Sequence, residues 1–172
     1  MGIDKHGSIV SQLSMKIGRK LKLPDEQLVK LTLAAFFHDV GKIFIPRDIL
    51  YKPDVLTIQE RVLIENHPNS GTLLLKENMH ISDTTILKAV LHHHEKFNGS
   101  GYPDKLAGND IPLFARIISL ADAYDAMTSE RPYKPRILTH KEVCEEISSS
   151  SGTHFDPELV EIFLTIIAKK RQ

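Results

Sequence analysis

Apolar side chains recur at helical spacing along nearly the whole chain. In the first stripe, residues three and four positions apart share one face: Ile9, Val10, Leu13, Ile17 and Leu21. No segment shows the sustained alternation of apolar and polar residues that is typical of a half-buried strand. The sequence therefore predicts an all-α fold. At 172 residues, we expect one domain spanning residues 1–172, a single compact bundle with a sizeable core.

Local signals predict where the helices begin. Thr57 and Thr139 are each followed three residues later by Glu, the capping-box pattern. Helix starts are also expected at Pro24, Ser82-Asp83, Pro112 and Asp156-Pro157. Loops are expected at Phe44–Lys52, Phe97–Ile111 and Ser148–Asp156. The middle loop is rich in glycine and contains Pro103, and an irregular segment of this length in a compact domain is often functional.

Composition and charge exclude several classes of protein. Lys+Arg and Asp+Glu both number 22, so a net charge of zero does not favour non-specific binding to nucleic acid. No apolar run reaches the roughly 18–20 residues of a membrane span, and no signal peptide begins the chain. The single cysteine, Cys144, excludes an internal disulfide. We expect a soluble, cytoplasmic domain without a membrane or nucleic-acid partner.

Histidine is the unusual component, with nine copies. Seven histidines and aspartates lie within, or at the ends of, the expected helices, and these are His6, His38, Asp39, His67, His93, His94 and Asp122. Taken singly, a histidine on an apolar face is more often a hydrogen-bonded core residue, and an aspartate near a helix end is often solvated or a cap. Taken together, five helices that each offer a ligand beside the apolar face meet the requirement of a metal centre inside a bundle.

The stretch AAFFHDVGK at residues 34–42 places His38, Asp39 and Lys42 among apolar residues. A buried charge is normally paired, neutralised or bound to a metal. The alternative is a helix end, with Gly41 as the C-cap and Lys42 beside the last carbonyls. His92 is left out of the ligand set because adjacent helical residues point about 100° apart. His80, His140 and His154 lie among polar residues and are interpreted as surface or capping groups.

An ordered set of motifs resembles the HD-GYP domain, a branch of the HD-domain metal-dependent phosphohydrolases. The motifs are HDVGK at 38–42, HP at 67–68, HHE at 93–95, GSGYP at 99–103, ARIISLADAYDAMTSERPY at 115–133 and FDPELV at 155–160. The resemblance implies a bundle of about seven helices. It also implies hydrolysis of the bacterial second messenger cyclic di-GMP to the linear dinucleotide pGpG and, in some members, to GMP.

The resemblance also implies roles for individual residues. All seven histidines and aspartates match metal ligands of the family, and Asp39 is expected to bridge two divalent transition metals. Iron or manganese is favoured, and nickel, cobalt and zinc also suit such ligands. Members with a third metal use a glutamate one turn before the first histidine, a position occupied here by Gly2. We therefore expect two metals, not three.

Further residues match family positions near the substrate. Lys42 is expected to stabilise charge that develops on the phosphate, in the catalytic set with Asp39. Tyr102, Arg131 and Lys134 are expected at the phosphates, and Asp125 at a guanine edge. Each of the four also has a non-functional alternative, which is loop packing for Tyr102 and ordinary surface charge for the others. Family members usually carry a regulatory sensor or receiver domain, or respond to a partner protein, and this sequence contains neither such domain.

Two rival hypotheses stay open. One is a module that binds a cyclic dinucleotide or a partner protein without catalysis, which the absence of the glutamate at position 2 allows. The other is an HD hydrolase acting on a related cyclic dinucleotide, such as a hybrid one. The retained His38-Asp39 pair, Lys42 and the full ligand set favour the phosphodiesterase.

Overall fold

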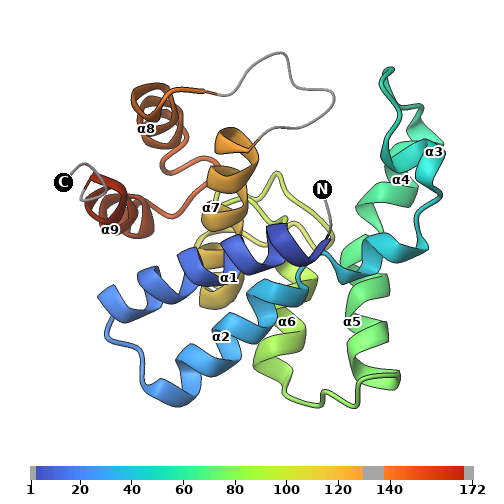
Figure 1. The fold of residues 1–172 in the computed structure, drawn as a ribbon, viewed down its shortest axis with the longest axis horizontal. Coiled ribbons are helices and arrows are strands. Elements are labelled where there is room, and N and C mark those ends of the chain that lie inside the picture. Colours follow the sequence, from blue (N-terminus) through green and yellow to red (C-terminus); the bar gives the residue numbers. More distant parts are fainter. Residues whose placement is uncertain (1–2, 130–137, 169–172) are drawn as a thin grey trace.

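The computed structural model describes residues 3–129 and 138–168 and is all-α within them, as predicted (Figure 1). Nine α-helices lie in these ranges: α1 Ile3–Lys20, α2 Asp25–Phe37, α3 Arg47–Leu50, α4 Ile58–Glu65, α5 His67–Glu77, α6 Thr84–His92, α7 Leu113–Thr128, α8 His140–Ser149 and α9 Pro157–Ala168. Two short 3₁₀ helices accompany them, η1 Val40–Phe44 and η2 Gly108–Asp110.

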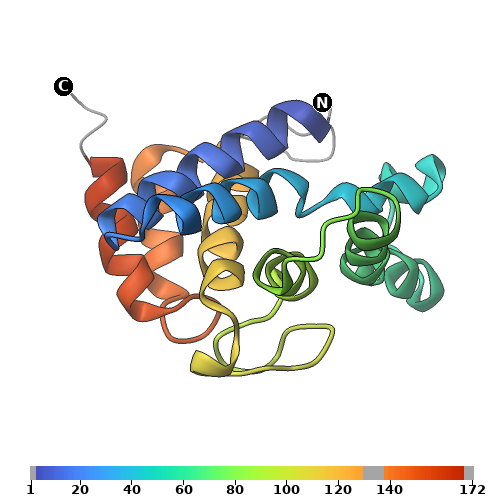
Figure 2. The same ribbon diagram turned by 90° about the horizontal axis from the view of Figure 1, so that it is seen from below.

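Helix α7 runs through the bundle, with α1, α6, α8 and α9 packed around it (Figure 2). Its side chains Ile117, Ile118 and Leu120 have no exposed surface, and Val10 and Ile17 of α1 are equally buried. Full burial of one such side chain stabilises the fold by about 1.5–3 kcal/mol. The apolar stripe predicted for the first helix is therefore one wall of the core.

The predicted helix starts are confirmed. Thr57 and Thr139 both form complete capping boxes with the glutamates three residues later. Asp83 caps α6 by accepting hydrogen bonds from the backbone N–H groups of Thr85 and Ile86. Pro24 and Pro112 are the residues directly before α2 and α7. Thr57, Asp83 and Thr139 work as signals because each satisfies backbone donors that a helix start leaves unpaired, whereas a proline suits a helix start through its fixed φ angle.

The segment around residues 40–68 differs from the prediction. The loop expected at Phe44–Lys52 contains the one-turn helix α3. The helix that starts after Thr57 is α4, which ends at Glu65. A separate helix, α5, begins at His67 with Pro68 in its first turn, where a missing N–H needs no partner. These additional helices raise the number above the expected seven.

Gly41 is not a helix C-cap. Helix α2 ends at Phe37 with His38 as its C-cap residue, and Gly41 lies in η1. A Cβ atom at Gly41 would lie 2.0 Å from the backbone oxygen of His67, so only glycine permits this approach of η1 to α5. The contact holds the segment after His38 against the helix that starts with His67.

Helices α3, α4 and α5 lie at the opposite end of the molecule from α8 and α9 (Figures 1 and 2). Neither α3 nor α4 buries a residue fully. Large apolar side chains are exposed along this part of the chain, and they include Ile43, Phe44, Val55, Ile58, Val62 and Leu63. Among the described residues, no helix combines the length and apolarity needed to cross a membrane.

Candidate metal centre and adjoining pocket

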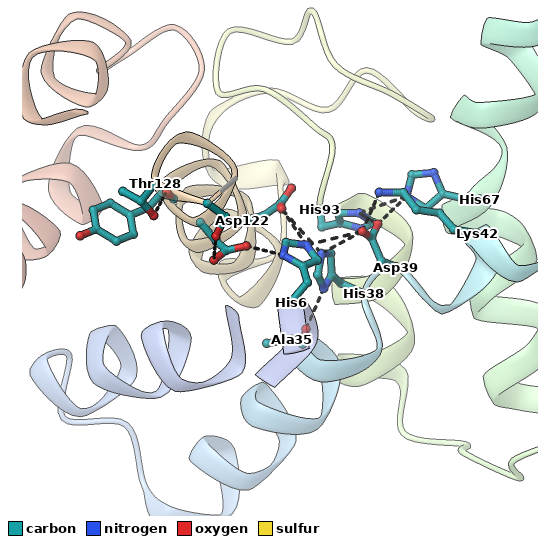
Figure 3. A network of polar contacts seen from close by, with 12 residues as sticks. His6, Ala35, His38, Asp39, Lys42, His67, His93, Asp122 and Thr128 are labelled. Carbon is teal, nitrogen blue, oxygen red and sulfur yellow. Dashed lines mark hydrogen bonds and ion pairs between the residues drawn. The ribbon is translucent and has the colours of Figure 1, made fainter. Parts of the chain in front are cut away.

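Five helices bring the predicted ligands to one interior point. His6 lies on α1, His38 and Asp39 follow α2, His67 opens α5, His93 and His94 follow α6, and Asp122 lies on α7. Figure 3 shows His6, His38, Asp39, His67 and His93 directed toward one another. The convergence depends on helix ends, because four of the seven residues lie just outside an α-helix. Two adjacent residues there can both face the centre, which the step of about 100° in an α-helix does not allow.

The ligand atoms form two groups that share Asp39. The first group contains Asp39, His67, His93 and His94, and the second contains His6, His38 and Asp39, with ligand atoms in each group within 4.8 Å of one another. Oδ1 of Asp39 lies 3.2 Å from Nε2 of His67, whereas Oδ2 lies 3.6 Å from Nε2 of His38. The two carboxylate oxygens thus face different groups, as a bridging ligand requires.

Asp122 extends the second group. Its Oδ1 lies 3.2 Å from Nε2 of His6 and 3.9 Å from Nε2 of His38. Each group therefore brings imidazole nitrogens and carboxylate oxygens together, a donor set that suits divalent transition metals.

Backbone carbonyls orient three of the imidazoles. The Nδ1 atoms of His38, His67 and His93 each lie 2.7 Å from a carbonyl oxygen three residues earlier in the chain. Since a carbonyl only accepts, Nδ1 carries the proton and Nε2 presents its lone pair to the centre. This arrangement fixes the tautomer that a metal-ligating histidine needs.

Of the five buried side-chain atoms that lack a hydrogen bond within the part of the chain that the structure describes, two belong to ligand candidates. They are Nε2 of His38 and Oδ1 of Asp39. A buried polar atom left without a partner costs about 1–3 kcal/mol. Both atoms point to the shared centre, where cations would satisfy them, so these residues fit a metal site.

The protonation states of the first ligand group suit a bound cation. Burial lowers the pKa of His93, and it lowers the pKa of His94 to about 3, so both imidazoles are neutral at pH 7. Burial alone would raise the pKa of Asp39, but its electrostatic interactions with His38 and with the Lys42 ammonium group hold it well below its usual range. Asp39 is therefore an ionised carboxylate inside the bundle.

The second group holds a proton on His6. Burial alone would lower the pKa of His6, but hydrogen bonds to Asp122, Asp125 and Asp39 outweigh it and raise this pKa to about 11. Burial would likewise raise the pKa of Asp122, yet the hydrogen bond from His6 brings it down to about 2. A cation at this group would take the place of the His6 proton.

Lys42 contacts the centre directly. Its Nζ donates to Oδ2 of Asp39 at 2.6 Å, and its side chain is about one-quarter exposed. The ammonium group thus faces the same carboxylate that joins the two ligand groups. This contact favours the predicted role at the centre over pairing with carbonyls at a helix end.

The loop after His94 folds back on the centre. The ring of Tyr102 stacks on His94 with centroids 4.9 Å apart and an interplanar angle of 29°. A Cβ at Gly101 would lie 2.4 Å from the backbone N of Lys96 and 2.6 Å from the oxygen of His94, so the loop approaches the end of α6 as closely as glycine allows. Tyr102 is thereby held beside a metal-ligand candidate.

His92 points away from the ligand groups, consistent with its exclusion from the ligand set. Its Nε2 lies 2.9 Å from Oδ2 of Asp104, and Glu95 accepts a hydrogen bond from the Asp104 backbone N–H at 2.7 Å. Sequence reasoning assigned no role to Glu95 or Asp104. Together these residues fasten the glycine-rich loop to the end of α6.

Asp125 lies behind His6. Its carboxylate accepts hydrogen bonds from Nδ1 of His6 at 2.6 Å and from Oγ of Ser129 at 2.8 Å, and its side chain is only 3% exposed. This position favours an orienting role toward His6 over the predicted contact with a guanine edge. The expectations for Gly2, Arg131 and Lys134 concern positions outside the described residues.

A pocket of about 280 Å³ opens beside the centre. Two ligand candidates, His94 and Asp122, form part of its wall, and Tyr102 lies next to them. Sequence reasoning missed three polar groups in the same wall, namely Lys96, Glu146 and His154. Their proximity comes from the packing of α8 and the segment after it near α7, for which no local sequence signal exists.

Comparisons with known proteins find relatives over most of this chain. The family model described as HD domain matches residues 2–159. The cyclic di-GMP phosphodiesterase PA4108 of Pseudomonas aeruginosa is 37% identical over 162 residues, which cover 94% of this chain and 38% of the relative. The 3'3'-cGAMP-specific phosphodiesterase 2 of Vibrio cholerae is 40% identical over 131 residues, 76% of this chain and 25% of the relative. The chain thus spans less than half the length of either relative.

A solved structure supports the fold. Bd1817, an HDG"Y"P protein from Bdellovibrio bacteriovorus, aligns with a TM-score of 0.77 at 24% identity, covering 97% of this chain and 53% of the other.

Proposed function

The chain belongs to the HD-domain family, and from this premise we propose that it is a metal-dependent phosphodiesterase that hydrolyses cyclic di-GMP. The observation that carries the proposal is the position of Asp39, whose two oxygens face two separate groups of ligand atoms. Relatives named as cyclic di-GMP phosphodiesterases support the choice of substrate. The proposed product is pGpG, with GMP if the linear dinucleotide is cleaved again.

The proposed cofactor is a pair of divalent transition metals. His6, His38 and Asp122 would hold one, His67, His93 and His94 the other, and Asp39 both. Iron and manganese are favoured, and nickel, cobalt and zinc match the same mixed nitrogen and oxygen ligands. When bound, such a pair supplies positive charge that polarises the phosphate and activates water at neutral pH.

The chain's own residues supply the remaining chemistry. The ammonium group of Lys42 lies at the centre, where it can stabilise negative charge that develops on the phosphate. Burial raises the pKa of Tyr102, so its hydroxyl keeps its proton and can donate to a phosphate oxygen. Arg131 and Lys134 remain proposed phosphate contacts on the strength of the family motif.

A paired measurement tests the proposal. Metal content and cyclic di-GMP turnover are measured for the wild type, for Asp39→Ala and for the control Asp48→Ala, an exposed aspartate on α3. We expect about two metals per chain and turnover in the wild type and control, and the loss of both in Asp39→Ala. A wild type that binds metal and cyclic di-GMP without turnover would instead identify a binding module.

A second substrate is included because one relative is named a 3'3'-cGAMP-specific phosphodiesterase. Parallel assays of cyclic di-GMP and 3'3'-cGAMP measure kcat/KM for each nucleotide. A higher kcat/KM for 3'3'-cGAMP than for cyclic di-GMP would identify 3'3'-cGAMP as the substrate. The proposed metal chemistry would stay unchanged.

A further inference from the structure

The pocket beside the metal centre contains polar groups that the proposed reaction does not use. We propose that it is a nucleobase subsite that selects guanine through the carboxylate of Glu146 and the ammonium group of Lys96. The inference rests on the proposed function, since it places a cyclic dinucleotide with one phosphate at the metal ligands.

The pocket shares two residues with the metal centre, and these residues locate the subsite. His94 and Asp122 belong both to the ligand groups and to the wall of the pocket. A phosphodiester bound at these ligands therefore has the pocket directly beside it, and the attached nucleoside has to occupy neighbouring space. A volume of about 280 Å³ is at the low end for ligand pockets, so it suits one nucleoside and not the whole dinucleotide.

The walls suit a flat aromatic base. Tyr102, Met127 and Phe155 line the pocket with aromatic and thioether surfaces. Tyr102 is already fixed by its stack on His94, and Phe155 is buried. Such surfaces bind the face of any base, because every base has a π-face. Discrimination between bases therefore has to come from polar groups at the base edge.

The charged groups in the wall match guanine. Guanine offers the donors N1–H and the N2 amine, which a carboxylate accepts, and the acceptors O6 and N7, which an ammonium group serves. Adenine lacks those two donors and presents an acceptor at N1, which would face the Glu146 carboxylate unfavourably. A site built to hydrogen-bond a group rejects an analogue that lacks it.

Lys96, Glu146 and His154 lie in the same wall of the pocket. Burial lowers the pKa of His154, the positive charge of Lys96 lowers it further, and Glu146 opposes the shift. His154 is therefore neutral at pH 7 and adds no charge of its own to the wall that it shares with Lys96 and Glu146. Asp125 cannot take the place of Glu146, because its buried carboxylate is engaged by His6 and Ser129 and does not line the pocket.

Glu146→Gln tests the subsite with a change that keeps size and removes charge. A glutamine can pair its oxygen and its amide with the N6 amine and N1 of adenine, whereas the amide opposes the N2 amine of guanine. We expect the ratio of kcat/KM for cyclic di-GMP to that for cyclic di-AMP to fall by about tenfold or more. The matched control is Glu145→Gln, an exposed neighbour that faces Lys141 and does not line the pocket.

Free nucleotides supply a readout that does not require turnover. Binding of GMP and AMP to the metal-loaded protein is measured by calorimetry for the wild type, Glu146→Gln and Lys96→Met. We expect the wild type to prefer GMP, and both substitutions to reduce that preference. Equal binding of GMP and AMP by the wild type, or an unchanged preference in Glu146→Gln, overturns the subsite.

The two proposals fail in different ways. A wild type that prefers GMP but turns over no cyclic dinucleotide refutes the phosphodiesterase and supports the subsite. A wild type that hydrolyses cyclic di-GMP with a base preference unaffected by Glu146→Gln refutes the subsite and leaves the phosphodiesterase standing.

Discussion

At the scale of single residues, Lys42 separates metal binding from catalysis. Its ammonium group contacts Asp39 but is not a metal ligand, so Lys42→Ala is expected to keep the metal content of the wild type. Loss of a group that stabilises charge in the transition state raises the activation free energy by about 2–4 kcal/mol, which lowers kcat roughly 30- to 10³-fold. The check is kcat for cyclic di-GMP together with metal analysis. Lys16→Ala, at an exposed position on α1, is the control, and equal kcat in Lys42→Ala would remove Lys42 from the mechanism.

His6 makes metal binding depend on pH. Its pKa of about 11 exceeds the ordinary 6.5, so its ion pairs stabilise the metal-free fold fully below pH 6.5, and that stabilisation is lost as pH rises toward 11. A metal at Nε2 has to displace this proton, and we expect the affinity for metal to rise between pH 6.5 and 8.5. Chelator competition measures the slope. A metal affinity that does not change between pH 6.5 and 8.5 would contradict the displacement of the His6 proton by the metal.

At the scale of elements, the glycine-rich loop depends on its close approach to α6. In Gly101→Ala the new Cβ would overlap backbone atoms of Lys96 and His94, so the loop has to move away and Tyr102 with it. Misplacement of a contact group by about 1 Å can cost 10²-fold in rate, and we expect kcat/KM to fall at least tenfold. Gly108→Ala is the control, because a Cβ there meets nothing within 4 Å and costs only about 1–2 kcal/mol of backbone strain at φ +55°. Equal kcat/KM values in the two variants would refute the positioning of Tyr102.

The same scale shows what the sequence could predict. Thr57, Asp83 and Thr139 marked helix starts correctly because a cap acts on the next three residues and needs no tertiary information. The start of α5 at His67 was not predicted, because a proline can follow the end of one helix and equally well lie in the first turn of another. The ligand histidines were predictable as a set with matching motifs. The partner of Asp125 and the position of Glu146 were not, since both depend on contacts between distant segments.

At the scale of the whole molecule, the metal centre joins five helices, and its loss should destabilise the fold. α5 is attached to the rest through η1 and α6, and His67 provides its link to Asp39. A metal present at 100 to 1,000 times its Kd adds about 2.7–4.1 kcal/mol to the free energy of unfolding, which corresponds to roughly 5–15 °C in Tm for a domain of this size. Chelation of the wild type should therefore lower Tm by that amount, and hydrogen exchange should accelerate in α5 before α9, which lies at the other end of the molecule. Asp39→Ala, which lacks the shared ligand, should show the same Tm with and without chelator. A wild type whose Tm does not respond to chelator would mean that the five helices hold together without the metals, and that Nε2 of His38 and Oδ1 of Asp39 are satisfied in another way.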